Sequence, residues 1–179
     1  AILFATQAHS GTYRKVDKTP YVMHPIEVAT IISSITNNED VIIAGLLHDT
    51  VEDTDATING IKEKFGDYVA QLVKSETEDK RPDQPSFETW KIRKEETLKG
   101  LEESKDINIK ILWLSDKLAN VRSLYRNYVK IGDKVFDSFN QKDKDEHKWY
   151  YYTILENISE LNNTVAYMEF EFLVKKIFE

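Results

Sequence analysis

The sequence contains no cysteine, and this absence excludes disulfide bonds and thiolate metal sites. The strong metal ligands that remain are histidine, aspartate and glutamate. No apolar run is long enough to span a bilayer, and no secretory signal pattern is visible. We therefore predict a cytoplasmic protein that does not insert into a membrane, although a chain that begins with alanine could have lost an N-terminal segment.

Positive charge is also scarce. The 24 Lys and Arg residues face 31 Asp and Glu residues, which gives a net charge of −7. Nonspecific binding to nucleic acid depends on Lys and Arg side chains that neutralise phosphates, so this composition argues against a nucleic acid partner. A small polyanionic substrate remains compatible with it, because a local basic rim or a bound metal can offset the overall repulsion.

The hydrophobic pattern predicts helices throughout, and no convincing alternation of a strand is visible. We expect helices over residues 1–9, 25–37, 39–53, 55–64, 66–75, 87–103, 106–128, 141–162 and 164–178. Residues 79–86 hold two of the four prolines and are expected to form a loop. At 179 residues, 41% of them hydrophobic, the chain is expected to be one domain of the all-α class, a helical bundle.

The densest group of ligand-type side chains is the stretch His48-Asp49-Thr50-Val51-Glu52-Asp53. On one continuous helix, residues four apart share a face, so His48 would lie beside Glu52 and Asp49 beside Asp53. The apolar run 41–47 would bury this helix, and charges beside such a run are costly to desolvate unless a metal compensates them. An isolated His-Asp pair is nevertheless more typical of an exposed acidic helix end, so further ligands are needed.

His24 and Asp116 supply those further ligands. Asp116 lies inside an apolar helix, where a carboxylate needs a partner, and a salt bridge to a neighbouring lysine is the alternative explanation. His24 precedes Pro25 at the start of another helix and would by itself be typical of capping or packing. Together with His48 and Asp49 they bring two imidazoles and two carboxylates from three helices, and we predict a single metal site between these helices.

This arrangement resembles that of the HD-domain metal phosphohydrolases, whose pattern is a His, an adjacent His-Asp pair and a distant Asp. Further motifs resemble the hydrolase domain of RelA/SpoT homologues, in the same order over residues 1 to about 126. They are Ala8-His9-Ser10-Gly11, Arg14-Lys15, Thr19-Pro20-Tyr21-Val22-Met23-His24-Pro25, the stretch from Leu46 to Thr54, Phe65-Gly66, Thr77-Glu78-Asp79-Lys80 and the stretch from Leu114 to Arg122. The chain is thus similar to a small alarmone hydrolase. The resemblance implies one HD-type domain over 1–179, with core motifs in 1–126 and C-terminal helices within 141–178 packed on them.

The resemblance also implies an activity. A small alarmone hydrolase removes the 3′-pyrophosphate of guanosine tetraphosphate or pentaphosphate, which leaves GDP or GTP and pyrophosphate. The implied metal ligands are His24, His48, Asp49 and Asp116. Manganese is usual in the family, and this mixed set of nitrogen and oxygen ligands also suits Fe²⁺. Glu52 and Asp53 would correspond to the family's catalytic pair, which orients the attacking water and shuttles its proton.

For the substrate, the resemblance implies a rim of polar side chains. Arg14 and Lys15 match a basic pair that lies against the guanine base and the nucleotide, although a solvated loop is the alternative. Asn120 matches a residue that hydrogen-bonds the ribose, and Arg122 would face the phosphates. Lys80 and Tyr150 are further, weaker candidates, for which a loop charge and a core aromatic are at least as good explanations.

Two other interpretations stay open at this point. The same metal chemistry could act on another nucleotide, such as an adenosine alarmone or the 2′-phosphate of NADPH. The chain could also be a non-catalytic alarmone-binding domain, which would predict lost ligands or a lost Glu-Asp pair, whereas both are intact here. The aromatic-rich C-terminal part is more typical of packing, but some of it could line a contact in a homodimer.

Overall fold

The computed structural model describes residues 1–81 and 83–179, and Pro82 of the expected loop lies outside the described residues. Within these ranges the regular structure is helical, which confirms the all-α class, and the only extended pairing is an isolated bridge between Tyr13 and Pro20. The α-helices are α1 (Ile2–Ala8), α2 (Met23–Ser33), α3 (Glu39–Leu47), α4 (Thr50–Asp53), α5 (Ile58–Phe65), α6 (Asp67–Glu76), α7 (Trp90–Glu103), α8 (Ile107–Ile131), α9 (Lys144–Asn157) and α10 (Val165–Phe178). Two 3-10 segments, η1 (Gly132–Ser138) and η2 (Ser159–Leu161), complete the chain.

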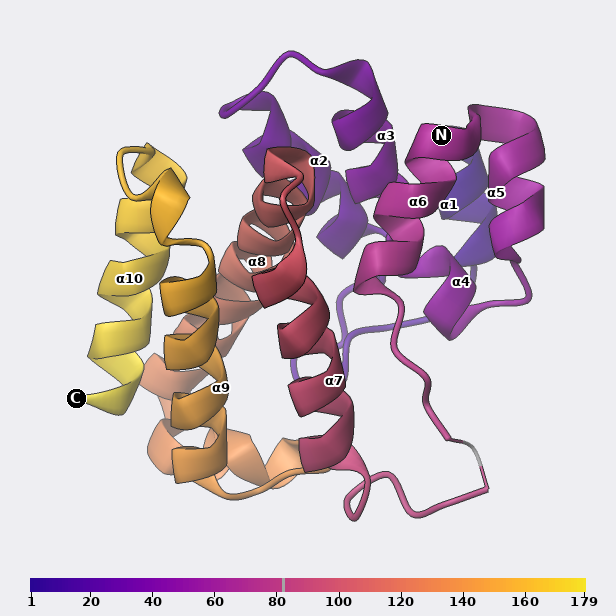
Figure 1. Cartoon of the computed structure of the whole chain (residues 1–179). Helices are drawn as coiled ribbons and strands as arrows, with labels where there is room; N and C mark the ends of the chain where they lie inside the picture. The colour runs from indigo at the N-terminus through magenta and orange to yellow at the C-terminus, as the bar shows by residue number, and fades with distance from the viewer. Residues whose placement is uncertain (82) are drawn as a thin grey trace.

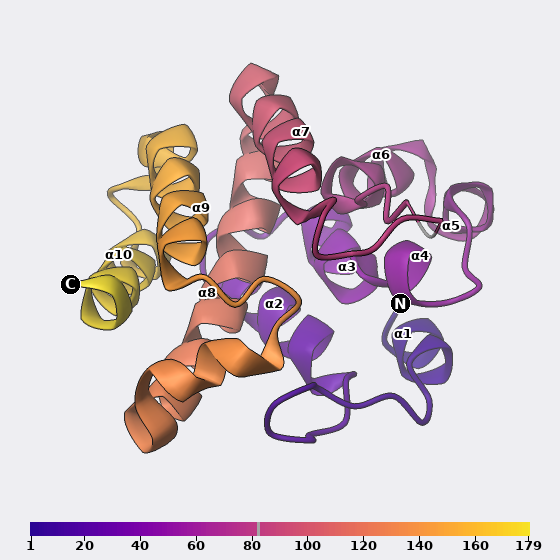
Figure 2. The same cartoon turned by 90° about the horizontal axis from the view of Figure 1, so that it is seen from below.

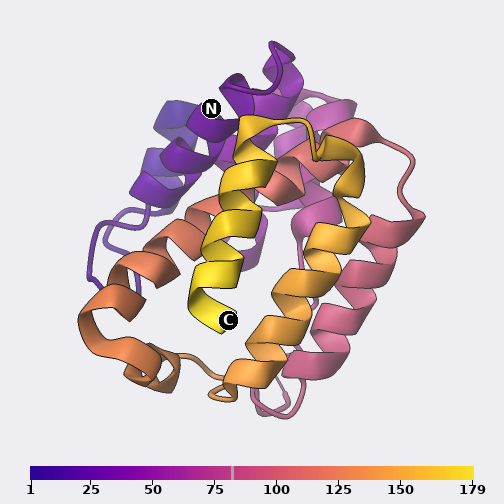
Figure 3. The same cartoon turned by 90° about the vertical axis from the view of Figure 1, so that its left-hand side faces the viewer.

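Helix α8 is the centre of the bundle (Figure 1). It contacts α2, α3 and α6 on one side and α10 on the other, and α7, α9 and α10 extend together along that second side (Figure 3). The helix begins where the Asp106 side chain accepts a hydrogen bond from the backbone N–H of Asn108, and it ends at Gly132, whose φ is +61°. Leu112, Leu118 and Val121 are fully buried, so α8 holds the two sides of the bundle on one apolar core.

Helices α2 and α3 pack closely, and this contact fixes the end of α3. Gly45 is the point of closest approach: a Cβ built there would overlap the Cδ1 atom of Ile32 and lie 3.4 Å from the Cα atom of Ala29. Ile32 is itself fully buried, so it has little room to move aside. The absence of a side chain at Gly45 therefore determines how near the C-terminal end of α3 lies to α2.

The expected single helix over 39–53 is wrong, because the helix is interrupted at His48 and Asp49. The imidazole Nδ1 of His48 donates to the carbonyl of Gly45 at 2.9 Å, and the Thr50 hydroxyl donates to the carbonyl of Leu47 at 2.7 Å. These side chains occupy carbonyls that backbone N–H groups would use in a continuous helix. His48 and Asp49 keep right-handed helical dihedrals, so the chain continues in the helical sense from the end of α3 into α4.

Other expected boundaries differ by a few residues. The helix expected over 55–64 begins at Ile58, with the Thr57 side chain accepting a hydrogen bond from the N–H of Gly60 as its cap. The helix expected over 141–162 is divided into α9 and η2. No helix within 1–81 or 83–179 combines the length and the apolar character needed to cross a membrane.

We expect Gly45→Ala to destabilise the protein by about 1–3 kcal/mol, because the added methyl group overpacks the contact between α2 and α3. Gly100→Ala is the matched control: Gly100 also lies inside a helix, but a Cβ there meets nothing within 4 Å. That substitution should stabilise by up to about 1 kcal/mol through helix propensity. Urea unfolding of both variants measures the difference, and equal stability of the two would contradict the close approach described here.

Candidate metal centre and substrate cavity

Three of the predicted ligands meet at the centre of the molecule. His24 comes from the first turn of α2, His48 directly follows α3, and Asp116 lies in the middle of α8. One ligand atom from each lies within 4.8 Å of the other two, and the three residues are only 5%, 2% and 3% exposed. The Oδ1 atom of Asp116 lies 3.0 Å from Nε2 of His24 and 3.5 Å from Nε2 of His48. This group can hold a metal ion.

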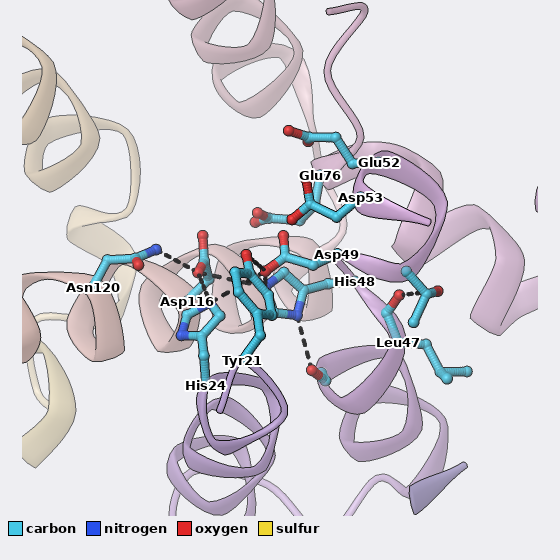
Figure 4. Close-up of polar contacts among 12 residues, drawn as sticks. Tyr21, His24, Leu47, His48, Asp49, Glu52, Asp53, Glu76, Asp116 and Asn120 are labelled. Carbon is cyan, nitrogen blue, oxygen red and sulfur yellow. Dashed lines mark hydrogen bonds and ion pairs between the residues drawn. The ribbon is translucent and has the colours of Figure 1, made fainter. Parts of the chain in front are cut away.

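Asp49, the fourth predicted ligand, faces the same two imidazoles (Figure 4). Its Oδ2 atom lies 3.0 Å from Nε2 of His48 and 3.4 Å from Nε2 of His24. It also accepts a hydrogen bond of 2.8 Å from the hydroxyl of Tyr21. Asp49 is not part of the compact group of three, but its oxygen is directed at the nitrogen atoms of that group.

The orientation of His48 is fixed by the backbone. A carbonyl only accepts hydrogen bonds, so the contact with Gly45 requires a hydrogen on Nδ1 and leaves the lone pair of the neutral ring on Nε2. Nε2 is fully buried and has no hydrogen-bond partner among the described residues, although it faces two carboxylates. A lone pair beside carboxylate oxygens is stable only when a positive charge lies between them. Imidazole nitrogen and carboxylate oxygen together suit a divalent metal.

The electrostatics of the site lead to the same conclusion. Burial by itself disfavours the imidazolium form of His48, but the carboxylates of Asp49 and Asp116 outweigh it and raise the pKa of His48 well above its usual value. Burial likewise works against the Asp116 carboxylate, yet Lys117 and the two imidazoles hold the pKa of Asp116 well below its usual value. The cluster thus attracts positive charge, which either protons or a metal cation can supply.

Asp116 is connected to the predicted substrate residues by hydrogen bonds. The side-chain amide of Asn120, one turn further along α8, donates to Oδ1 of Asp116 at 2.7 Å. The amide oxygen of Asn120 accepts from Nη2 of Arg14, also at 2.7 Å. Lys117 donates to the other carboxylate oxygen, Oδ2. Asp116 therefore has fixed partners on both oxygens, and Arg14 lies two hydrogen bonds away from it.

Glu52 and Asp53 lie on α4, next to the metal-binding group but outside it. Oε2 of Glu52 accepts from the backbone N–H of Glu78 at 3.2 Å, and Lys80 lies 3.5 Å from Oε1 of Glu52 and 2.5 Å from Oδ1 of Asp53. Burial raises the pKa of Glu52, and the nearby carboxylates of Asp49 and Glu78 raise it further. A carboxylate with a raised pKa accepts a proton more readily than an ordinary glutamate.

A cavity of about 630 Å³ opens beside this group. Its wall is formed by the loops between α1 and α2 and between α6 and α7, by α4, α7, α8 and α9, and by the segment after η1, which lies on the same side of the molecule as the first of these loops (Figure 2). Arg14, Lys15, Lys80 and Asn120 line it, as do Glu52 and Asp53. Lys80 is paired with the two acids, whereas no carboxylate of the described residues lies within 4.0 Å of the Arg14 or Lys15 charge. These two cations are available to an anionic ligand.

Two predicted substrate residues are not brought to this cavity. The guanidinium of Arg122 makes two hydrogen bonds of 2.6 Å to Glu169 of α10 and one of 3.2 Å to Glu27 of α2. Tyr150 is only 6% exposed and its hydroxyl is fully buried, and the cavity is lined by the next residue, Tyr151, instead. Arg122 connects helices, and Tyr150 packs in the core.

Two residues beside the site, Tyr21 and His9, were not predicted as site residues. The Tyr21 ring lies 4.8 Å from the His9 ring, centroid to centroid, and both residues line the cavity. His9 is 3% exposed, and neither ring nitrogen has a partner among the residues that the structure describes. Both residues occur in the motifs that carry the family resemblance. No spacing, however, connects Tyr21 with Asp49, which follows 28 residues later.

Comparison with known proteins agrees with this geometry. The HD domain family matches residues 1–141. A guanosine-3′,5′-bis(diphosphate) 3′-pyrophosphohydrolase of Aquifex aeolicus is 38% identical over 122 residues, which are 68% of this chain and 17% of that protein. The human guanosine-3′,5′-bis(diphosphate) 3′-pyrophosphohydrolase MESH1 is 37% identical over 126 residues, 69% of this chain and 66% of that protein. The chain thus spans less than two thirds of the length of these relatives.

Solved structures are similar over most of the chain. A metazoan ortholog of SpoT, described as hydrolysing ppGpp and having a role in starvation responses, superposes with a TM-score of 0.77 and 27% identity over 98% of this chain and 92% of that one. The protein lmo0812 of Listeria monocytogenes EGD-e gives a TM-score of 0.75 and 35% identity over 87% of this chain and 98% of that one. From the matched motifs, the helical fold and the meeting of His24, His48 and Asp116, the chain belongs to the HD-domain family.

Proposed function

We propose that this chain is a metal-dependent hydrolase that removes the 3′-pyrophosphate of guanosine tetraphosphate and pentaphosphate to give GDP or GTP and pyrophosphate. The observation that carries the proposal is the buried group of His24, His48 and Asp116 beside a cavity lined by two acids of α4 and two cations of the loop between α1 and α2. The names of the Aquifex and human relatives support the choice of substrate.

His24, His48, Asp49 and Asp116 would hold the metal, with Mn²⁺ as the first choice and Fe²⁺ as the alternative. When bound, such an ion supplies Lewis acidity that activates water and neutralises charge on phosphoryl oxygens. The contact between Nδ1 of His48 and the Gly45 carbonyl keeps Nε2 directed at the ion. The hydroxyl of Tyr21 holds Asp49 in the same way.

Glu52 and Asp53 would handle the water and its proton. The water forms a bond to the phosphorus attached to O3′ of the ribose, the bond between that phosphorus and O3′ breaks, and pyrophosphate leaves. Glu52 is suited to accept the proton of the water because its pKa is raised, and the proton passes finally to O3′. Lys80 holds Asp53 and Glu52 together through its contacts with both carboxylates.

Arg14 and Lys15 would bind the nucleotide. Arg14 lies with its guanidinium 5.5 Å from the centroid of the Tyr21 ring and is held by Asn120, so a planar cation is presented at the cavity wall. A planar guanidinium can stack on a base, and Lys15 adds a point charge for phosphate. Arg122 and Tyr150 are left out of this proposal, because Arg122 is bound by Glu169 and Tyr150 is buried.

We propose further that residues 1–179 form one HD-type hydrolase domain, which acts in the cytoplasm on a small-molecule nucleotide. A homodimer through the aromatic C-terminal helices is not part of the proposal. Packing accounts for Tyr151 and Phe170 of those helices, which are buried within the chain itself, whereas Phe172 of α10 is 55% exposed.

The direct test uses the Mn²⁺-loaded protein and measures release of pyrophosphate from guanosine 3′-pyrophosphates and an adenosine alarmone, and release of inorganic phosphate from NADPH. We expect turnover of guanosine tetraphosphate with GDP and pyrophosphate as products. Turnover of another nucleotide without cleavage of the guanosine compounds would overturn the substrate assignment. Tight nucleotide binding without turnover of any compound would instead support a non-catalytic alarmone-binding domain.

Glu52→Gln should lower kcat by about 100-fold or more, because it removes the proton acceptor, while binding of Mn²⁺ persists. Glu63→Gln is the control, since Glu63 is an exposed acid on α5. Metal content and single-turnover rates measure the two effects separately. A Glu52→Gln protein with unchanged kcat would exclude the assigned role.

The pH dependence of the rate follows from the raised pKa of Glu52. The carboxylate accepts a proton only when ionised, so activity should fall as the pH is lowered through this pKa, and the fall should lie above 4.5, the ordinary value for glutamate. Hydrolysis rates at saturating Mn²⁺, measured across the acid pH range, follow this fall in activity. The residual activity of Glu52→Gln should not show the fall, and an identical fall in that variant would assign the titration to another group.

A further inference from the structure

A buried ion-pair chain extends from the metal centre through two residues, Lys117 and Glu76, that do not line the cavity. Lys117 donates to Oδ2 of Asp116 and lies 3.4 Å from Oε2 of Glu76, so one ammonium is shared between two carboxylates. The side chains of Lys117 and Glu76 are 13% and 3% exposed. The chain connects the last residue of α6 with the metal-binding turn of α8.

Glu76 lies in an unfavourable place for a carboxylate. It is the last residue of its helix, where the negative end of the helix dipole repels an anion. Its second oxygen, Oε1, is buried without a hydrogen-bond partner among the described residues. Burial raises the pKa of Glu76 to about 7, although the ammonium of Lys117 opposes this. Packing alone gives no reason for an acid here, because an apolar side chain at this position would avoid these costs.

The net charge of the buried cluster explains why an acid lies at position 76. Asp49, Asp116 and Glu76 contribute three negative charges and Lys117 contributes one positive charge, while the neutral imidazoles contribute none. Two negative charges remain, and a divalent cation neutralises them. Without Glu76 the loaded cluster would retain a positive charge in a buried environment, which is unfavourable.

The geometry adds a second effect. A cation at Oδ1 of Asp116 and the ammonium of Lys117 at Oδ2 would repel each other across one carboxylate. Glu76 offers the ammonium another acceptor on the side away from the imidazoles. Lys117 is also held by the ring of Trp113, whose centroid is 4.6 Å from Nζ, so the ammonium has a fixed place between its two acids. In Figure 4 the carboxylate of Glu76 lies on the same side of the imidazoles as those of Asp49 and Asp53.

We propose that Glu76 is a positioning residue for the metal centre: it shares the ammonium of Lys117 with Oδ2 of Asp116, and so reduces the repulsion between that ammonium and a divalent cation bound at Oδ1. The inference rests on the metal centre of the proposed function, but not on the identity of the nucleotide. Glu76 does not line the cavity, and it would act through its ion pair with Lys117.

The test is calorimetric titration of the metal-free protein with Mn²⁺ at pH 8, where Glu76 is ionised. Glu76→Gln keeps the shape of the side chain and removes its charge, and the Kd for Mn²⁺ should rise about tenfold. The Tm of the metal-free variant should stay the same or rise, because a costly buried charge is gone. A merely structural role predicts the opposite pattern, with an unchanged Kd and a lower Tm, and that result would overturn the proposal.

Glu169→Gln is the matched control, because Glu169 also pairs with a cation of α8, Arg122, but lies away from the metal ligands. Its Kd for Mn²⁺ should equal that of the unaltered protein. In a protein that also carries Lys117→Met, Glu76→Gln should have much less effect on the Kd for Mn²⁺, because the ammonium through which Glu76 acts is absent. If the unaltered protein binds no Mn²⁺, the proposed metal centre is wrong. If it binds Mn²⁺ only as tightly as the Glu76→Gln protein does, the metal centre stands and only the proposed role of Glu76 is wrong.

Discussion

The proposed activity depends on the meeting of two buried imidazoles with buried carboxylates at the junction of three helices. His24, His48 and Asp116 are almost completely removed from water, and their ligand atoms face one another. Such a group is stable only with positive charge at its centre. The fold supplies the geometry through the close contact of α2 with α3 at Gly45, whose carbonyl also orients the imidazole of His48.

Helix α8 connects this centre to the rest of the protein. Three of its residues lie within little more than one turn: Asp116 is a proposed ligand, Lys117 is the cation shared with Glu76, and Asn120 is the link to Arg14. In the proposed function, metal affinity, substrate binding and core packing would therefore be coupled through a single helix. If the proposed role of Glu76 is right, a change in the core near Glu76 would alter the metal centre without touching the cavity.

Much of this could be predicted from the sequence. The periodic spacing of apolar residues was sufficient to predict the all-α class. A long apolar pattern such as that of α8 indicates a helix even where single residues within it have a low helix propensity. The residues of the metal-binding group were expected because two imidazoles and two carboxylates in apolar surroundings need a cation. The resemblance over residues 1 to about 126 placed the chain in the family that the comparisons confirm. Other features could not be predicted, because they depend on contacts between distant segments. The interruption at His48 arises from side-chain hydrogen bonds to carbonyls, which compete with a helix that the pattern favours. Arg122 was expected at the phosphates, but Glu169, 47 residues later, binds it. The pairing of Glu76 with Lys117 spans 41 residues, and no local pattern distinguishes such an acid from a solvated one.

The most direct test of the metal centre is anomalous X-ray diffraction from crystals of the protein grown with Mn²⁺. We expect one strong peak per chain, within coordination distance of His24, His48, Asp49 and Asp116. A peak bound elsewhere, or none at this position when Mn²⁺ is in excess, would show that these four side chains do not form a metal site.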